Sequence, residues 1–232
     1  MTSTVAMSRG CGAEPHTDGG ASMARIIRFY LAALLVLLGV QVAWIGPARA
    51  DAFSIYRGHG VDANLVEIPG MLLSSDLPYE DCYFWGVGYR WQTNTPGWLA
   101  STGRWVGLSN IRTGVELMEV KYSGLQDNYE TDLAYVMELS QLEFWGVTLK
   151  LTIGYGPSVA HGTPSYEDGP EDDPDKRYKF QLYGMYETEW GLRDYPAVSI
   201  VYKVHHRSGA FGLVAPPRVG SNFMTWGLRY RF

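Results

Sequence analysis

Alternation of apolar and polar residues is the dominant pattern of the chain from residue 51 onward. Successive side chains of a β-strand point to opposite faces, so this alternation predicts strands that each have one apolar face. We predict strands at residues 82–91, 114–122, 132–139, 145–155, 180–190, 198–208 and 223–232. No apolar run after residue 50 approaches the roughly 20 residues that a membrane-spanning helix needs. The pattern therefore indicates an all-β protein.

The polar faces of these strands indicate which kind of β-protein this is. In the last strand, Arg229 and Arg231 lie opposite a face made of apolar and aromatic residues, and Arg90 and Lys150 do the same in earlier strands. A small barrel in water would not direct arginines into an apolar core, whereas a transmembrane barrel has a polar lumen and an outside that faces lipid. We therefore predict an eight-stranded antiparallel transmembrane β-barrel of the bacterial outer membrane. The terminal Phe232 resembles the last residue of the closing strand in such barrels.

The eighth strand has two candidates. Residues 64–73 alternate weakly but contain Pro69, which disfavours the interior of a strand, and residues 98–108 are the alternative. Outer-membrane barrels have short periplasmic turns and longer outside loops. The remaining connections fit this rule, with outside loops at 156–176 and 209–221 and short turns at 140–144 and 191–194. The connection at 92–112 should be short and is not, so it is either an elaborated turn or contains the strand at 98–108.

The first 50 residues have the features of an export leader. A basic segment with Arg25 and Arg28 precedes an apolar stretch at 29–42, and Ala48-Arg49-Ala50 has the small-x-small pattern of a cleavage site. These features predict a non-structural extension at 1–22, a secretory signal peptide at 23–50 and a barrel at 51–232. A transmembrane anchor helix at 29–45 is the alternative interpretation.

Composition limits the partners that the chain can have. Its net charge of −5 makes it a poor nucleic-acid binder. Cys82 is the only cysteine after the leader, and no Cys-x-x-Cys or His/Cys cluster is present, so we predict no disulfide within the barrel, no metal site and no cofactor. The acidic run at 167–175 is predicted to be a solvated loop, with a divalent-cation site that bridges to lipid phosphates as the alternative.

Candidate chemistry lies at the end of the strand at 198–208. Residues two apart share a face of a strand, so His206 and Ser208 project together from its apolar, outward side. A base beside a hydroxyl is the minimum arrangement for nucleophilic catalysis. Asn222 has the parity of the outward residues of the next strand and, as an antiparallel neighbour, is placed to orient His206. His205 is the competing base, but its parity places it in the lumen.

The segment Val204-His205-His206-Arg207-Ser208-Gly209, followed by Gly220-Ser221-Asn222 at the start of the closing strand, resembles the lipid A 3-O-deacylase family (PagL-type, acyloxyacyl-hydrolase-like). That family has a His-x-Ser-Asn motif late in an eight-stranded outer-membrane barrel. The resemblance implies hydrolysis of the ester-linked 3-hydroxyacyl chain at position 3 of lipid A, near the outer leaflet, with Ser208 as nucleophile and His206 as general base. Lipopolysaccharide and outer-membrane lipid would be the partners, and a homodimer is a further expectation.

Two positions depart from the pattern of that family. Asn222 stands where the family has an acid, and Gly209 stands where its Asn is thought to help form the oxyanion hole, so the Gly209 N–H or Arg207 must serve instead. An amide can hold the imidazole tautomer but does not balance an imidazolium charge, which predicts a slow esterase. The alternative function is a non-enzymatic structural or adhesive barrel, because eight strands are too narrow for a solute channel.

Overall fold

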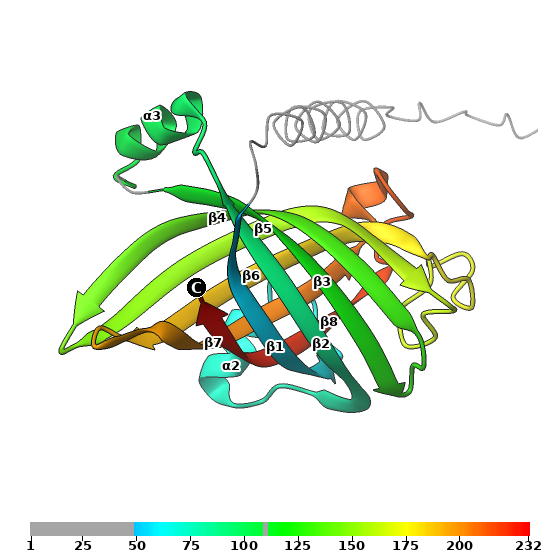
Figure 1. Cartoon of the computed structure of the whole chain (residues 1–232). Coiled ribbons are helices and arrows are strands. Elements are labelled where there is room, and N and C mark those ends of the chain that lie inside the picture. Colours follow the sequence, from blue (N-terminus) through cyan, green and yellow to red (C-terminus); the bar gives the residue numbers. More distant parts are fainter. Residues whose placement is uncertain (1–48, 109–110) are drawn as a thin grey trace, which may run out of the picture.

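The structure is a computed structural model, and it describes residues 49–108 and 111–232. Eight strands form one closed antiparallel barrel in which neighbours in the chain pair and the first strand pairs with the last (Figure 1). This confirms the predicted fold. The predicted extension at 1–22 and the signal peptide as far as residue 48 lie outside the described residues. The strands are β1 (Arg49–Val61), β2 (Tyr79–Thr93), β3 (Arg112–Gly124), β4 (Tyr129–Phe144), β5 (Val147–His161), β6 (Phe180–Leu192), β7 (Tyr195–Ser208) and β8 (Gly220–Arg231).

Burial alternates along the strands, as the apolar and polar pattern predicted. In β2, the rings of Trp85 and Tyr89 are exposed on the outer wall while Arg90 is buried in the lumen. In β6, Glu187 and Glu189 are buried in the lumen although both are carboxylates. Apolar side chains on the outside and charged side chains inside are the arrangement of a barrel that faces lipid.

The start of β5 differs from the prediction. Trp145 and Gly146 have φ angles of 49° and 81°, and they form a two-residue turn between β4 and β5 in which Trp145 is 99% exposed. Two successive positive φ values are typical of tight turns that match the twist of a β-hairpin. The strand therefore begins at Val147, and the short turn lies at 145–146 rather than at 140–144. The tight turn predicted at 191–194 is present between β6 and β7.

Both candidates for the eighth strand were wrong. Residues 64–73 overlap the short helix α2 (Ile68–Ser74), which has Pro69 in its first turn, where proline is tolerated. Residues 98–108 overlap helix α3 (Gly97–Trp105), which lies between β2 and β3 at the turn end of the barrel (Figure 1). The long connection at 92–112 is therefore an elaborated turn. No helix in the described part of the chain is long and apolar enough to cross a membrane.

The eighth strand is β1, which begins at Arg49, two residues before the predicted start of the mature chain. Its outward residues are apolar near the turn end, as Phe53 and Ile55 illustrate, but Arg57 and His59 follow on the same face. These two basic residues interrupt the apolar alternation, which explains why the strand was not predicted.

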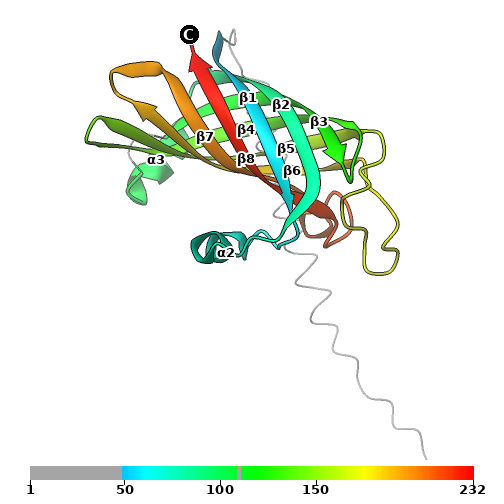
Figure 2. The same ribbon diagram turned by 90° about the horizontal axis from the view of Figure 1, so that it is seen from below.

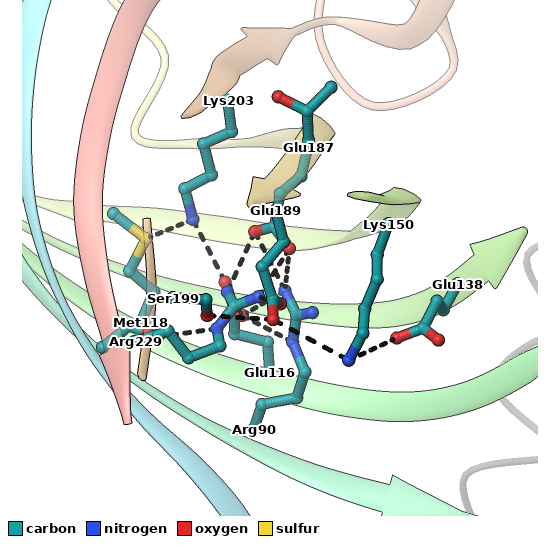
Figure 3. A network of polar contacts seen from close by, with 12 residues as sticks. Arg90, Glu116, Met118, Glu138, Lys150, Glu187, Glu189, Ser199, Lys203 and Arg229 are labelled. Carbon is teal, nitrogen blue, oxygen red and sulfur yellow. Dashed lines mark hydrogen bonds and ion pairs between the residues drawn. The ribbon is translucent and has the colours of Figure 1, made fainter. Parts of the chain in front are cut away.

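Part of the lumen holds charged side chains that pair with one another (Figure 3), beside a buried cluster that includes Phe84, Tyr122 and Phe223. Arg229 on β8 lies 2.7 Å from carboxylate oxygens of both Glu187 and Glu189 and donates to the Tyr56 hydroxyl at 2.7 Å. Glu116 lies 2.6 Å from the Arg90 guanidinium and 3.1 Å from the Lys203 ammonium. These contacts join residues from six strands into one group, which we call the lumen network: Tyr56, Arg90, Glu116, Glu187, Glu189, Lys203 and Arg229.

A segment at residues 62–78, which contains α2 and which we call the α2 segment, lies outside the barrel wall (Figures 1 and 2). The Asp62 N–H donates to the Pro78 carbonyl at 3.0 Å and closes the base of this segment. Ile68 packs into a buried apolar cluster with Val61 and Met224, where it is 2% exposed. The α2 segment therefore covers the outer wall where β1 meets β8.

Candidate functional site

The outer wall at the loop end of β7 and β8 carries the predicted catalytic residues. His206 on β7 pairs directly with Asn222 on β8, and Ser208 pairs with Gly220. His206 and Ser208 are half-buried on the outer face, whereas His205 is fully buried in the lumen, where its Nε2 lies 2.9 Å from Asp132. The alternation of the strand thus separates the two histidines onto opposite faces.

His206, Asn222 and the backbone of Ala63 form a chain of hydrogen bonds. His206 Nδ1 lies 2.7 Å from Asn222 Oδ1, and Asn222 Nδ2 donates to the Ala63 carbonyl at 2.8 Å. Because a carbonyl only accepts, the Asn222 amide must turn its NH₂ to Ala63 and its oxygen to His206. An amide oxygen also only accepts, so Nδ1 carries the proton and Nε2 keeps its lone pair. This is the tautomer that a general base requires.

A glycine on the neighbouring strand makes room for the His206 ring. Gly184 on β6 pairs with His206, and a Cβ built on Gly184 would lie 3.4 Å from His206 Cδ2 and 3.3 Å from Tyr155 Cε1. Any larger side chain at position 184 would push against both rings. The imidazole is therefore held between Asn222 on one side and a flat surface made by Gly184 and Tyr155 on the other.

Ser208 shares this face but does not join the hydrogen-bond chain. Its Oγ accepts a hydrogen bond from the Ala210 N–H at 3.4 Å, and among the described residues no hydrogen bond joins Ser208 to His206. Residues two apart on a strand have Cα atoms about 7 Å apart. A side-chain rotation that brings the hydroxyl toward Nε2 is therefore needed before proton transfer, as is common in substrate-free sites.

The turn that follows Ser208 has an unusual backbone. The short helix η1 (Ala210–Gly212) contains Ala210 and Phe211 with φ angles of 50° and 57°, in the left-handed region that residues other than glycine rarely adopt. A Cβ on Gly209 would lie 2.2 Å from the Pro216 carbonyl oxygen. Gly209 is therefore required by the packing of its own loop, and an asparagine does not fit there without a rearrangement.

Arg207 was predicted as a substitute oxyanion donor, and the structure contradicts this. Its side chain is fully buried in the lumen, where it lies 3.0 Å from Glu130, pairs with Glu167 and donates to the Lys179 carbonyl at 2.9 Å. Its parity is opposite to that of Ser208, so it points away from the outer wall. The backbone donor that lies beside Ser208 is the Ala210 N–H.

The outer face at Asn222 is covered rather than open to lipid. Asn222 is only 8% exposed because Ala63 and the rest of the α2 segment lie over it. The prediction that Asn222 faces lipid was therefore wrong, although its place on the outer wall was correct. Sequence reasoning missed the contribution of Ala63, because a backbone carbonyl 159 residues away leaves no local signal.

The acidic run at 167–175 is not a uniformly solvated loop. Glu167, its first residue, folds into the mouth of the lumen, where it is 1% exposed and pairs with Arg207. Burial raises the pKa of Glu167 to about 8, because its effect and that of the Glu130 carboxylate outweigh the opposing effect of Arg207. The next residue, Asp168, donates its N–H to the Gly220 carbonyl at 3.0 Å, which ties this loop to the start of β8.

Glu130, Asp132 and His205 place ligand-type atoms within 4.8 Å of one another inside the lumen. His205 Nε2 lies 3.3 Å from Glu130 as well as 2.9 Å from Asp132, and Arg207 lies 3.0 Å from Glu130. Ion pairing with His205 and Arg207 brings the two carboxylates together, while Asp132 Oδ1 and His205 Nδ1 have no hydrogen-bond partner among the described residues.

Solved structures place this geometry in a known architecture. A structure described as the outer membrane enzyme PagL aligns with a TM-score of 0.51 at 12% identity, over 78% of this chain and 99% of that chain. The chain has the fold of an outer-membrane barrel. Neisserial surface protein A (NspA) aligns with a TM-score of 0.45 at 10% identity, over 81% of this chain and 100% of that one. No protein-family model and no curated protein matches the sequence. At these identities the likeness shows the fold alone.

Proposed function

We propose that this barrel is an esterase of the outer leaflet that removes the ester-linked 3-hydroxyacyl chain at position 3 of lipid A. The observation that carries the proposal is the chain from Ala63 through Asn222 to His206 Nδ1, which holds the imidazole in the basic tautomer on the outer wall beside Ser208. Lipid-facing polar groups are disfavoured unless they serve a purpose. A site on the outer wall meets an acyl ester without requiring the substrate to enter the filled lumen.

In the proposed reaction, Ser208 Oγ attacks the ester carbonyl carbon while His206 Nε2 takes the hydroxyl proton. The tetrahedral intermediate collapses by breaking the bond to the sugar oxygen, which leaves with the proton from His206. Water then attacks the acyl-serine, again with His206 as base, and releases the 3-hydroxy fatty acid and free Ser208. Atoms and protons balance without a metal or cofactor.

Backbone amides supply the oxyanion contact in this proposal. The Ala210 N–H lies beside the nucleophile, with its nitrogen 3.4 Å from Ser208 Oγ. Strained backbone conformations such as those of Ala210 and Phe211 persist where the surrounding structure holds them, and they concentrate at functional sites. Backbone donors explain how the site dispenses with a side-chain amide at position 209.

Asn222 limits the rate that this site is expected to reach. Its amide oxygen fixes the imidazole tautomer but does not neutralise the imidazolium that forms during catalysis. Replacement of the acid by its amide in a serine protease costs about 10⁴-fold, mainly because the wrong tautomer results. Here Ala63 enforces the correct one, so we expect a smaller loss and a slow but measurable esterase.

The test is mass spectrometry of lipid A from cells that express the protein. The wild type should remove one 3-hydroxyacyl chain, and Ser208→Ala and His206→Ala should abolish this. The matched control is Ser221→Ala, which removes a hydroxyl on the next strand but on the lumen side. All variants must show the heat-dependent gel migration of a folded barrel. Unmodified lipid A from a folded wild type would reject the enzyme and leave the non-enzymatic structural or adhesive barrel, which the separate hydrogen bonding of Ser208 and His206 favours.

A further inference from the structure

Two basic residues stand out on the lipid-facing wall of β1. Arg57 and His59 are outward and partly exposed, while Gly58 between them is buried toward the lumen. The guanidinium carbon of Arg57 lies 4.9 Å from the ring centroid of Tyr83 and 5.1 Å from that of Trp85. Among the described ion pairs, none includes Arg57. Charged side chains on the lipid face are disfavoured, so an unpaired arginine here needs an explanation.

The two basic residues open into a groove of about 250 Å³, which we call the Arg57 groove. The His59 ring stacks between Tyr79 and Tyr83, with both ring centroids 4.5 Å away. The two tyrosine rings hold the His59 imidazole in one orientation, so that its nitrogen atoms are fixed in place at the groove. The groove is lined by Arg57, His59, Tyr79, Tyr83, Met224 and Trp226.

The Arg57 groove adjoins the His206 site without using its residues. His59 pairs with Met224, which is two residues along β8 from Asn222 on the same face. Residues that pair across neighbouring strands lie progressively closer to the loop end from β1 to β7. The line of paired residues that starts at Ala52, near the turn end of β1, ends at Arg207, near the loop end of β7. This progression is the tilt of a closed barrel. It brings His59 to about the level of His206.

The chemistry of the groove selects an anion attached to an apolar body. A guanidinium presents a planar fork of donors that suits phosphate oxygens, and the imidazole and tyrosine hydroxyls can donate to the same group. Trp226 and the aliphatic wall below, which includes Ile55 and Leu228, offer mainly apolar contact, and the indole N–H of Trp226 adds one donor. We propose that the Arg57 groove binds the phosphate of an outer-leaflet lipid, with the acyl chains of that lipid lying along β1 and β8. This site does not depend on ester hydrolysis.

Native mass spectrometry of the purified full barrel tests the proposal, carried out in the Ser208→Ala background so that hydrolysis plays no part. The probes are phosphatidic acid, which has a terminal phosphate, and phosphatidylcholine, in which the phosphate is capped. We expect the barrel to retain phosphatidic acid at least about tenfold better, because a terminal phosphate offers the bidentate contact. Equal retention of the two lipids would overturn the proposal.

Variants locate the effect. Arg57→Gln together with His59→Gln should reduce the preference for phosphatidic acid to near unity, while Lys121→Gln, which removes an outward cation of β3 paired with Asp127, should leave it unchanged. A preference that survives the double substitution would overturn the site. Inorganic phosphate is the remaining probe: it should displace the lipid only at much higher concentration. Displacement at equal concentration would show a free-phosphate site and contradict a lipid ligand.

Discussion

At the scale of single residues, Asn222 has two tasks. Its amide oxygen fixes the His206 ring, and its NH₂ group holds the α2 segment through the Ala63 carbonyl. A carboxylate, which the resemblance leads one to expect here, could perform only the first task, because it would face the Ala63 oxygen without a hydrogen to donate. An asparagine at this position thus fits the segment that covers the outer wall.

Asn222→Ala should lower kcat by on the order of 10²–10³-fold with little change in KM, because the imidazole loses its orienting partner. It should also free the Ala63 carbonyl, at a cost of about 1–3 kcal/mol for a buried acceptor without a donor. Kinetics on purified lipid A and the pH profile of kcat provide the measurement. Asn222→Asp is the conservative variant and should recover kcat relative to Asn222→Ala. If all three proteins share one pH profile, Asn222 does not position His206.

Much of the candidate site could be predicted from the sequence, because alternate residues of a strand point to the same face of the sheet. His206, Ser208 and Asn222 fall on one face once two strands alternate and pair, and the structure has that pairing. The roles of these residues stay a prediction. Arg207 was assigned wrongly, although its parity already placed it in the lumen. The strained turn after Ser208 could not be foreseen, since Ala210 and Phe211 are not residues that favour positive φ.

At the scale of elements, the α2 segment is the part of the chain that covers the outer wall of the barrel where β1 meets β8. Ile68 anchors it in the cluster with Val61 and Met224, while Leu73 on the same helix is 89% exposed. A helix of seven residues has little stability of its own. Packing on the barrel therefore holds it in place.

Ile68→Ala should loosen the α2 segment without unfolding the barrel. Loss of a buried Ile side chain costs about 2–5 kcal/mol where the site cannot collapse, and we expect the lower end because the cluster lies at the surface. Hydrogen exchange of residues 62–78 should accelerate accordingly. Leu73→Ala should change the opening free energy derived from hydrogen exchange by no more than about 0.5 kcal/mol, because its side chain is exposed. Equal effects of the two substitutions would show that Ile68 is not the anchor.

Glu167 gives the loop between β5 and β6 a dependence on pH. Its pKa rises from 4.5 to about 8 on folding because burial disfavours the carboxylate. A raised folded pKa means that the contribution to stability is complete below the unfolded pKa and is lost as pH rises through about 8. Hydrogen exchange at residues 162–179, corrected for intrinsic rates, should therefore increase between pH 6 and pH 9.

Glu167→Gln should remove this dependence, because the amide imitates the protonated acid. Asp175→Asn, at an exposed acid of the same loop, should retain it. A wild-type loop that exchanges equally at both pH values would contradict the buried, protonated Glu167.

The elements that were mispredicted have two physical causes. β1 was missed because Arg57 and His59 occupy its lipid side, and helices α2 and α3 were considered as strands because short apolar stretches fit either period. Strands that carry no basic residue on the outward face, such as β2 and β6, were predicted almost completely. On the outer wall, prediction therefore failed at the strand whose lipid-facing side is not continuously apolar.

At the scale of the whole molecule, the lumen network connects strands that are distant in sequence. Glu187 accepts from both Arg90 and Arg229, and it is almost completely buried. Removing one partner of such a buried group leaves an uncompensated charge, which costs about 3–5 kcal/mol. The lumen is thus a stabilising core that tolerates little change.

Glu187→Gln should lower the free energy of unfolding by about 3–5 kcal/mol, because two arginines lose their shared carboxylate. Urea unfolding of the barrel in lipid vesicles measures this. The control is Asp127→Asn, which breaks an exposed pair with Lys121 and should cost no more than about 1 kcal/mol. Equal midpoints for the two variants would mean that the lumen network is not what holds the barrel.

The contacts of Arg229 cross the seam at which the chain closes on itself. From β8 it donates to Ser54 and Tyr56 on β1 and to glutamates on β6. Separation of the first and last strands would break both hydrogen bonds to β1, while the glutamates of β6 would stay on the Arg229 side of the opening. Two β1 hydroxyls would thus have to leave a buried guanidinium before the barrel could open sideways, at a cost of about 1.5–3 kcal/mol for each such hydrogen bond.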